Sequence, residues 1–270
     1  MSLEDFFQPI EMELQEDQNG ETRLHQKIEI HTPTHFPELK GAQIAIFGVK
    51  EDRRTDHNKG CSAPQRIRNY LYALHQYDMP LPVVDLGDMA QGHTVEDTDY
   101  AVKTVCQELM KQNIIPLIIG GSQDITYSMY TAYEAMEQTV NLVTIDQRLD
   151  FGEAGDSFTS TNYLNKIVLH SPNYLFNFSN IGHQRYLVDG ELIELMDKMY
   201  FDLYRLGDVN GNIGLSEPVV RNADILSFDL SAIRASDASG TFQSGPNGLN
   251  GEYACQISRY AGMSDKLSSF

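Results

Sequence analysis

Short apolar runs recur along the chain from about residue 41 onward. They are rich in Ile and Val, do not alternate with polar residues, and fall at 44–49, 82–86, 114–119, 142–145 and 225–230. Strands that are buried on both faces, as in a parallel sheet, have this pattern. We therefore predict a strand over each run.

The segments between the runs repeat apolar residues at helical spacing. One face of 98–112 carries Val102, Val105, Cys106, Leu109 and Met110, and similar patterns fall at 66–77, 125–138 and 191–206. Strands that alternate with helices predict right-handed βαβ units. The chain is therefore expected to form an α/β domain over 41–270, with three layers and a mostly parallel sheet flanked by helices. Residues 1–40 are acidic and weakly periodic, and we interpret them as an N-terminal extension.

The balance of charged residues limits which kinds of partner the protein is expected to bind. The chain has 20 Lys and Arg against 38 Asp and Glu, which gives a net charge of −18 at pH 7. So acidic a protein repels nucleic acid and anionic membranes, and we expect neither as a partner. No apolar run approaches the about 20 residues of a membrane helix, so membrane insertion is not expected. The acidic N-terminus is not a secretory signal and the three cysteines indicate reduced thiols, which together predict a cytoplasmic protein.

Polar and acidic residues follow three of the predicted strands. Ser122–Gln123–Asp124 follows one run, Asp146 and Asp150 follow the next, and Asp229 follows the last. Because parallel strands end at one edge of a sheet, these groups are expected to converge there. Converging carboxylates repel one another unless a cation lies between them. Any single Asp after a strand is also a common loop starter or helix cap, so each fragment alone is a weak signal.

Taken in order, the fragments resemble the arginase, agmatinase and formimidoylglutamase family of binuclear manganese ureohydrolases. The matching stretches are GGSQD (120–124), DQRLD (146–150), SFDLS (227–231), GPNGLNGEY (245–253) and, upstream, the loop and helix over 48–74. The resemblance implies an arginase-like fold over 41–270. It also implies that the family's last strand and helix are missing, and that the protein forms an oligomer, as family members commonly do.

The resemblance also exposes departures at the metal ligands. The family holds two Mn²⁺ ions with two histidines and four aspartates. The histidines fall on Gln123 and Arg148, and the aspartates fall on Asp146, Asp150, Asp229 and Ser231. Gln offers one neutral oxygen, Ser a weak hydroxyl ligand, and Arg no acceptor. We therefore expect Asp146, Asp150 and Asp229 to be remnants of a degenerate metal site.

Arg148 leaves two alternatives for this site. Its guanidinium could replace the metal by bridging the aspartates in bidentate pairs, which would lower their pKa values and make them poorer bases. Alternatively, Arg148 turns to solvent and the three aspartates hold one weak Mg²⁺ or Mn²⁺ ion. We expect the first arrangement, and with it a salt bridge from Arg148 to at least one of the three.

Two further positions are candidate ligand-binding residues by the same resemblance. Asn162 lies in the loop after DQRLD and could hydrogen-bond a substrate carboxylate, although a turn-stabilising role is the favoured alternative for it. The family's late glutamate, which binds the guanidino group, falls on Tyr253 or, with a slip of one residue, on Glu252. We take Glu252 as the candidate and assign no catalytic residue.

These departures favour a degenerate ureohydrolase-like protein over an active enzyme. We expect a pseudoenzyme without a cofactor that acts as a binding, scaffold or regulatory subunit. Its partner would be another protein or a second copy of the chain, and its small ligand a guanidino compound or an amino acid. The alternative is a manganese-dependent hydrolase of a guanidino or formimino C–N bond, as in formimidoylglutamase, agmatinase or arginase.

Overall fold

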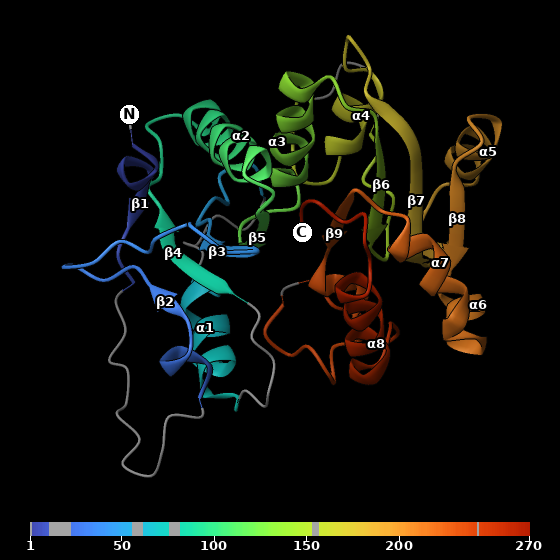
Figure 1. Ribbon diagram of the computed structural model, residues 1–270. Helices are drawn as coiled ribbons and strands as arrows, with labels where there is room; N and C mark the ends of the chain where they lie inside the picture. Colours follow the sequence, from blue (N-terminus) through green and yellow to red (C-terminus); the bar gives the residue numbers. More distant parts are fainter. Residues whose placement is uncertain (1, 11–22, 56–61, 76–81, 153–156, 242) are drawn as a thin grey trace. The chain divides into compact units, whose positions relative to one another are not determined.

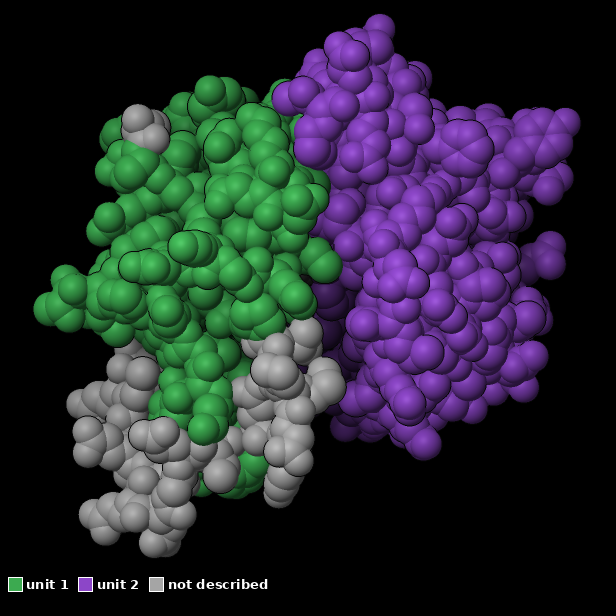
Figure 2. Space-filling view, viewed as in Figure 1, with its two compact units in different colours: residues 1–132 green, residues 133–270 purple. Residues whose placement is uncertain are grey.

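A computed structural model describes residues 2–10, 23–55, 62–75, 82–152, 157–241 and 243–270 (Figure 1). The chain forms two compact units, residues 1–132 and 133–270, which Figure 2 colours green and purple. We call them the first and second units. Each has its own sheet. Among the described residues no helix is both long and apolar enough to cross a membrane.

The first unit contains a five-stranded sheet. Its strands are β1 (Phe7–Gln8), β2 (Glu29–Ile30), β3 (Ile44–Gly48), β4 (Val83–Met89) and β5 (Ile115–Ile119). The order is β1-β4-β3-β5, with β2 also paired to β4, and every pair is parallel except β1 with β4. The region expected to be an N-terminal extension therefore contributes two short strands to this sheet. Its helices are α1 (Ala63–Ala73), α2 (Val95–Lys111) and α3 (Ile125–Ala132).

Helix α2 illustrates how the sequence specifies an element. The Thr94 hydroxyl accepts from the Asp97 backbone N–H while the Asp97 carboxylate accepts from the Thr94 backbone N–H, so a capping box begins the helix. Its buried face includes Val102, Cys106 and Leu109, the stripe expected from the apolar spacing. The helix therefore begins at a local signal and packs by its apolar face.

The second unit contains a four-stranded, all-parallel sheet in the order β8-β7-β6-β9. Its strands are β6 (Val140–Ile145), β7 (Leu175–His183), β8 (Asp202–Arg205) and β9 (Ile225–Phe228). Its helices are α4 (Tyr163–Val168), α5 (Gly190–Lys198), α6 (Leu206–Gly211), α7 (Ser216–Arg221) and α8 (Gly251–Gly262). One apolar core joins Val143 and Leu226 of the sheet to Ile257 of α8. The sheet is thus a buried platform whose carboxyl edge carries the polar loops.

Six short 3-10 helices complete the described elements. They span Leu3–Phe6, Leu24–Gln26, Tyr133–Met136, Arg185–Leu187, Ile213–Leu215 and Leu230–Ala232.

The α/β class and the mostly parallel sheets flanked by helices are confirmed, and all five predicted runs form strands. The helix predicted over 191–206 is wrong in its second half, because α5 ends at Lys198 and β8 follows at Asp202–Arg205. Apolar residues of a short strand after a helix continued the helical spacing by chance. Strand β7 was not predicted, since Asn177, Ser179 and Asn180 interrupt its apolar run.

Candidate functional site

The carboxyl edge of the second sheet brings three aspartates together. Asp146 directly follows β6, and Asp229 directly follows β9. These strands are parallel neighbours with Ile145 opposite Phe228, and the Asp229 N–H donates to the Ile145 carbonyl at 2.9 Å. Asp150 lies four residues after Asp146, in a left-handed backbone conformation with φ of 45° that turns the chain. Strand register and one tight turn therefore place three carboxyl groups in one cluster.

Burial and mutual repulsion disfavour charge in this cluster. Burial, followed by the negative charges of Asp150 and Asp229, raises the pKa of Asp146 well above its ordinary value. Burial likewise raises the pKa of Asp150 to about 7, with a contribution from Asp229 that the nearby positive charge of Arg148 opposes. The pKa of Asp229 is also raised by burial, against hydrogen bonds from Ser231. The expectation that Arg148 lowers these pKa values overall is therefore wrong, because its attraction is smaller than the cost of burial.

Some of the carboxyl oxygens have local backbone partners. Asp146 Oδ1 accepts from the Arg148 N–H at 2.9 Å, and Asp229 Oδ1 accepts from the Ser231 N–H at 2.6 Å. Both contacts are of the kind in which an Asp side chain caps the turn that follows it. Asp146 Oδ2, in contrast, is buried without a hydrogen-bond partner. The cluster thus combines capped turns with an unsatisfied carboxyl oxygen.

Arg148 does not bridge the aspartates, so the expected salt bridge is wrong. Its side chain is exposed, and its Nη1 donates to the Leu187 carbonyl at 3.4 Å. The same turn that directs the Arg148 backbone N–H toward Asp146 allows the side chain to extend to solvent. There the guanidinium keeps its hydration and avoids the desolvation cost of a buried pair.

Replacement of Arg148 by alanine is expected to change the free energy of unfolding by less than about 0.5 kcal/mol, because an exposed arginine with one long hydrogen bond contributes little. Urea denaturation of both proteins at pH 7 measures the difference. A loss of several kcal/mol would mean that Arg148 pairs with the aspartates in solution.

Stability should also fall as the pH rises from about 4 toward 7. Folded Asp150 keeps its proton up to a pKa of about 7, whereas its ordinary value is 3.8, so the folded state binds more protons in this window. The slope per additional proton is at most about 1.4 kcal/mol per pH unit. Asp150→Asn should reduce the dependence of stability on pH, as measured by thermal unfolding at several pH values between 4 and 7. Comparing the native chain with the variant at each pH cancels the contributions of other titrating groups, including His183, whose lowered pKa acts in the opposite direction. Equal pH dependence of stability in the two proteins would contradict the raised pKa of Asp150.

A network of amide side chains lies at the same edge and was not expected from the sequence. Gln147 Nε2 donates to the Gln243 carbonyl at 2.9 Å, and Gln184 Nε2 donates to the Asn247 carbonyl at 3.1 Å. The Tyr186 hydroxyl in turn donates to Gln184 Oε1. These contacts join the ends of β6 and β7 to the loop that precedes α8. The polar residues that directly follow β7 were the available signal, but β7 itself went unrecognised.

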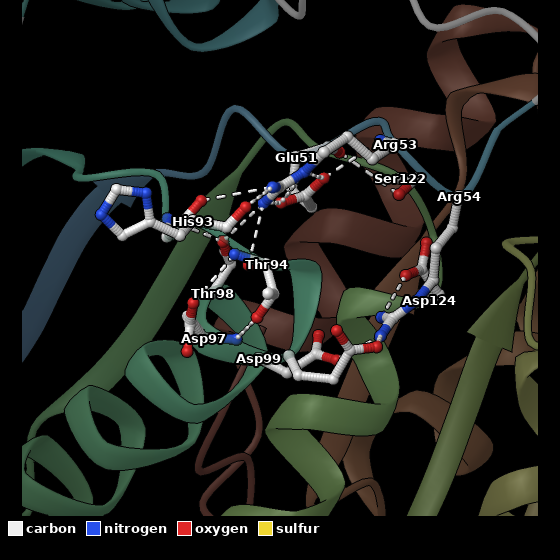
Figure 3. Close-up of polar contacts among 12 residues, drawn as sticks. Glu51, Arg53, Arg54, His93, Thr94, Asp97, Thr98, Asp99, Ser122 and Asp124 are labelled. Atoms are coloured by element: carbon white, nitrogen blue, oxygen red, sulfur yellow. Dashed lines mark hydrogen bonds and ion pairs between the residues drawn. The ribbon is translucent and has the colours of Figure 1, made fainter.

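Gln123 lies in the first unit, on the turn after β5. Gly120 and Gly121 have φ of 82° and 79°, which explains the paired glycines there. The next residues are held by ion pairs, since Arg54 contacts the buried Asp124 at 3.1 Å and Asp99 at 2.7 Å (Figure 3). This segment is therefore fixed by a cluster of charges on the loop after β3 and on α2.

The two candidate ligand-binding residues have different surroundings. Asn162 is buried, accepts from the Thr159 N–H at 2.8 Å and donates to the Ser157 carbonyl at 2.8 Å, so its amide stabilises its own loop. Glu252 is exposed in the first turn of α8, whereas Tyr253 packs against the apolar core. Among the described residues, neither side chain forms a hydrogen bond or ion pair with the aspartate cluster.

The donor groups fit a binuclear manganese centre poorly. Among the residues that the structure describes, no three His, Cys, Asp or Glu side chains are grouped so that they could hold a metal ion. The negative charges of Asp150 and Asp229 nevertheless contribute to the raised pKa of Asp146. Ser231 is buried beside them and contributes only a hydroxyl.

The chain is similar in sequence to proteins of known family. The Arginase family pattern matches residues 42–270. Formimidoylglutamase of Staphylococcus epidermidis is 22% identical over 127 residues, which are 44% of this chain and 41% of that protein. The mitochondrial agmatinase of Gallus gallus is 26% identical over 121 residues, 41% of this chain and 36% of that protein. The chain spans about half the length, or less, of the curated relatives it matches.

Solved structures match the fold more completely. Trypanosoma cruzi formiminoglutamase with Mn²⁺ has a TM-score of 0.80 at 19% identity, covering 93% of this chain and 89% of that one. Formimidoylglutamase from Bacillus subtilis has a TM-score of 0.79 at 17% identity, covering 96% of this chain and 86% of that one. With the family pattern matched along most of its length, and with the fold of these enzymes, the chain belongs to the arginase family.

Proposed function

We propose that this chain is an arginase-family protein that does not perform binuclear manganese ureohydrolysis and acts instead as a binding subunit. The observation that carries the proposal is the donor set at the carboxyl edge of β6 and β9. Three aspartates occur there beside an outward-facing Arg148 and a Ser231 whose backbone N–H is capped by Asp229, where the resemblance implies a fuller ligand set. We assign it a small guanidino or amino-acid ligand, with a second copy or another protein as partner.

The chemistry of the reaction supports this proposal. Ureohydrolysis at neutral pH needs a strong nucleophile, and a metal pair supplies one by lowering the pKa of bound water. The aspartates alone have no such means of activating water. Asp146 and Asp229 instead cap the local turns that follow their strands.

A hydrolase acting on a guanidino or formimino C–N bond is the second candidate, and one observation favours it. The pKa of Asp150 is about 7, so its carboxyl group is matched to accept a proton near neutral pH. Family relatives named formimidoylglutamase and agmatinase are consistent with this candidate.

Metal content tests the proposal. After incubation with excess Mn²⁺ and desalting, we expect elemental analysis to find less than one manganese ion per chain, because loss of even supporting groups around a metal weakens binding about 10–100-fold. Asp150→Asn, treated identically, controls for adventitious ions. Two stoichiometric manganese ions, absent from the variant, would overturn the proposal and support the hydrolase.

A further inference from the structure

A polar cavity of about 200 Å³ lies toward the amino ends of β6, β7 and β8 in the second unit, the sheet shown in Figure 1. Two residues of each strand form its floor, and Pro218 and Val219 of α7 form part of its wall. The aspartate cluster follows the opposite, carboxyl ends of β6 and β9. The cavity is therefore a separate place on the same sheet, and the proposed function does not involve it.

The strand register brings polar side chains together on the cavity floor. Ser179 of β7 is paired with Val143 of β6 on one side and with Asp202 of β8 on the other, and neighbouring strands are about 4.8 Å apart. Asn177, two residues before Ser179 and on the same face, donates from Nδ2 to Asp202 Oδ2 at 2.8 Å. Burial, followed by the negative charge of Asp202, raises the pKa of Tyr204, which keeps the phenol protonated beside this carboxylate. Two hydroxyls and an amide therefore surround one acidic group.

The two hydroxyls have unused hydrogen-bonding capacity. Within the part of the chain that the structure describes, nothing forms a hydrogen bond with the hydroxyl of Ser179 or of Tyr204. Ser179 is only 5% exposed, yet its oxygen is not among the enclosed unpartnered atoms of the described residues, so it opens into the cavity. Because buried polar groups normally have partners, a free hydroxyl at this depth indicates that the cavity holds a hydrogen-bonding molecule.

The cavity also carries one negative charge without a cation from the described residues. Asp202 takes part in none of their ion pairs. Arg205, on the same strand, directs Nη2 to Asp208 at 3.1 Å, and Lys266 directs Nζ to Asp224 Oδ2 at 3.3 Å. A divalent metal ion prefers several carboxylates, whereas a single carboxylate suits a monovalent positive group. The charge therefore favours an organic cation.

The hydrogen bond that Asp202 already accepts distinguishes between two kinds of organic cation. Since Asn177 donates to Oδ2, Oδ1 is the oxygen left for a ligand, and the two-pronged pairing of a guanidinium with both oxygens is disfavoured. An ammonium instead donates three separate hydrogen bonds, which one carboxylate oxygen and the two hydroxyls can accept. The donor and acceptor set of the cavity thus suits a primary ammonium.

We propose that this cavity binds a small primary amine, with its ammonium at Asp202, Ser179 and Tyr204. Val143 on the floor and Val219 on the wall supply apolar surface for a short alkyl chain. The cavity volume of about 200 Å³ equals that of roughly seven water molecules, which is room for an amine of about four carbons.

Isothermal titration calorimetry of the native chain with n-butylammonium at about pH 7.5 tests the proposal. The uncharged n-butanol, which has the same length, should bind at least about 10-fold more weakly, because hydrogen bonds to charged groups are roughly twice as strong as neutral ones. Butyrate should bind more weakly still, since its carboxylate is repelled by that of Asp202. Equal affinity for n-butylammonium and n-butanol, or no binding of the amine up to about 10 mM, would overturn the proposal.

Variants locate the amine. Asp202→Asn should weaken n-butylammonium binding about 10–100-fold and remove the preference over n-butanol, while asparagine can still accept the bond from Asn177. Tyr204→Phe keeps the ring against the apolar core and removes only the hydroxyl, so it should weaken binding about 3–10-fold without changing the melting temperature.

Asp197→Asn, on the exposed face of α5, is the matched control. It removes the same charge from the same unit and should leave the affinity for n-butylammonium within about twofold. Thermal unfolding checks that each variant is folded. Unchanged affinity in both Asp202→Asn and Tyr204→Phe would refute the amine site, whatever the manganese content of the chain.

Discussion

Replacement of Arg68 by alanine is expected to lower the free energy of unfolding by about 3–5 kcal/mol, the usual cost of removing one partner from a buried ion pair. Arg68 is 1% exposed, and its Nε and Nη2 donate to the two oxygens of the fully buried Asp85 at 2.8 and 2.9 Å. Its Nη1 also donates to Asp88. Loss of the guanidinium leaves two carboxylates of the first unit without their main buried cation.

Arg66→Ala is the matched control for this effect. Arg66 lies on the same helix, α1, but is exposed, so its removal should cost less than about 0.5 kcal/mol. Urea denaturation followed by circular dichroism measures both variants under one set of conditions. Similar urea midpoints for Arg68→Ala and Arg66→Ala would show that water replaces the ion pairs of Arg68 at little cost in stability.

The fold was largely predictable because buried parallel strands leave a local signal. The runs at 44–49 and 114–119 contain consecutive β-branched and apolar residues, and they form the two adjacent strands β3 and β5. Strand β7 lacked this signal, since the buried Asn180 satisfies its amide on neighbouring backbone carbonyls rather than packing apolar atoms. Tertiary hydrogen bonds of that kind cannot be inferred from periodicity.

The candidate site was predictable to the level of strand ends but not of side-chain direction. Asp146 and Asp229 follow adjacent parallel strands, so their proximity follows from topology. The direction of Arg148 depends on the turn that its own backbone N–H makes with Asp146, and on the cost of desolvating a guanidinium. The spacing of residues along the sequence gives no information on either the turn or the desolvation cost. The contact of Gln184 with Asn247 likewise joins segments far apart in sequence.

The purified chain, supplied with Mn²⁺, is expected to release no measurable urea from arginine or agmatine and no formamide from formiminoglutamate. Metal-bound water is the nucleophile that a ureohydrolase generates at neutral pH. Asp150, with a pKa of about 7, could accept a proton, but general-base assistance typically contributes only about 10²–10⁴-fold. A carboxylate acting as general base therefore accounts for only a small part of the rate acceleration that ureohydrolysis needs. Robust turnover by the native chain would refute the binding-subunit proposal.

The double variant Gln123→His with Arg148→His distinguishes loss of chemistry from loss of the binding site. It restores imidazole at the two positions where the family resemblance implies histidine ligands, whereas arginine offers no acceptor and glutamine only one neutral oxygen. Gln123→Asn with Arg148→Lys alters the same positions without adding a ligand and is the matched control. Manganese-dependent turnover in the histidine variant alone would mean that the substrate site persists and that two side chains account for the lost reaction. Absence of turnover in both variants would instead mean that restoring the two imidazoles is not sufficient, and would place the divergence in the remaining ligand positions Asp146, Asp150, Asp229 and Ser231.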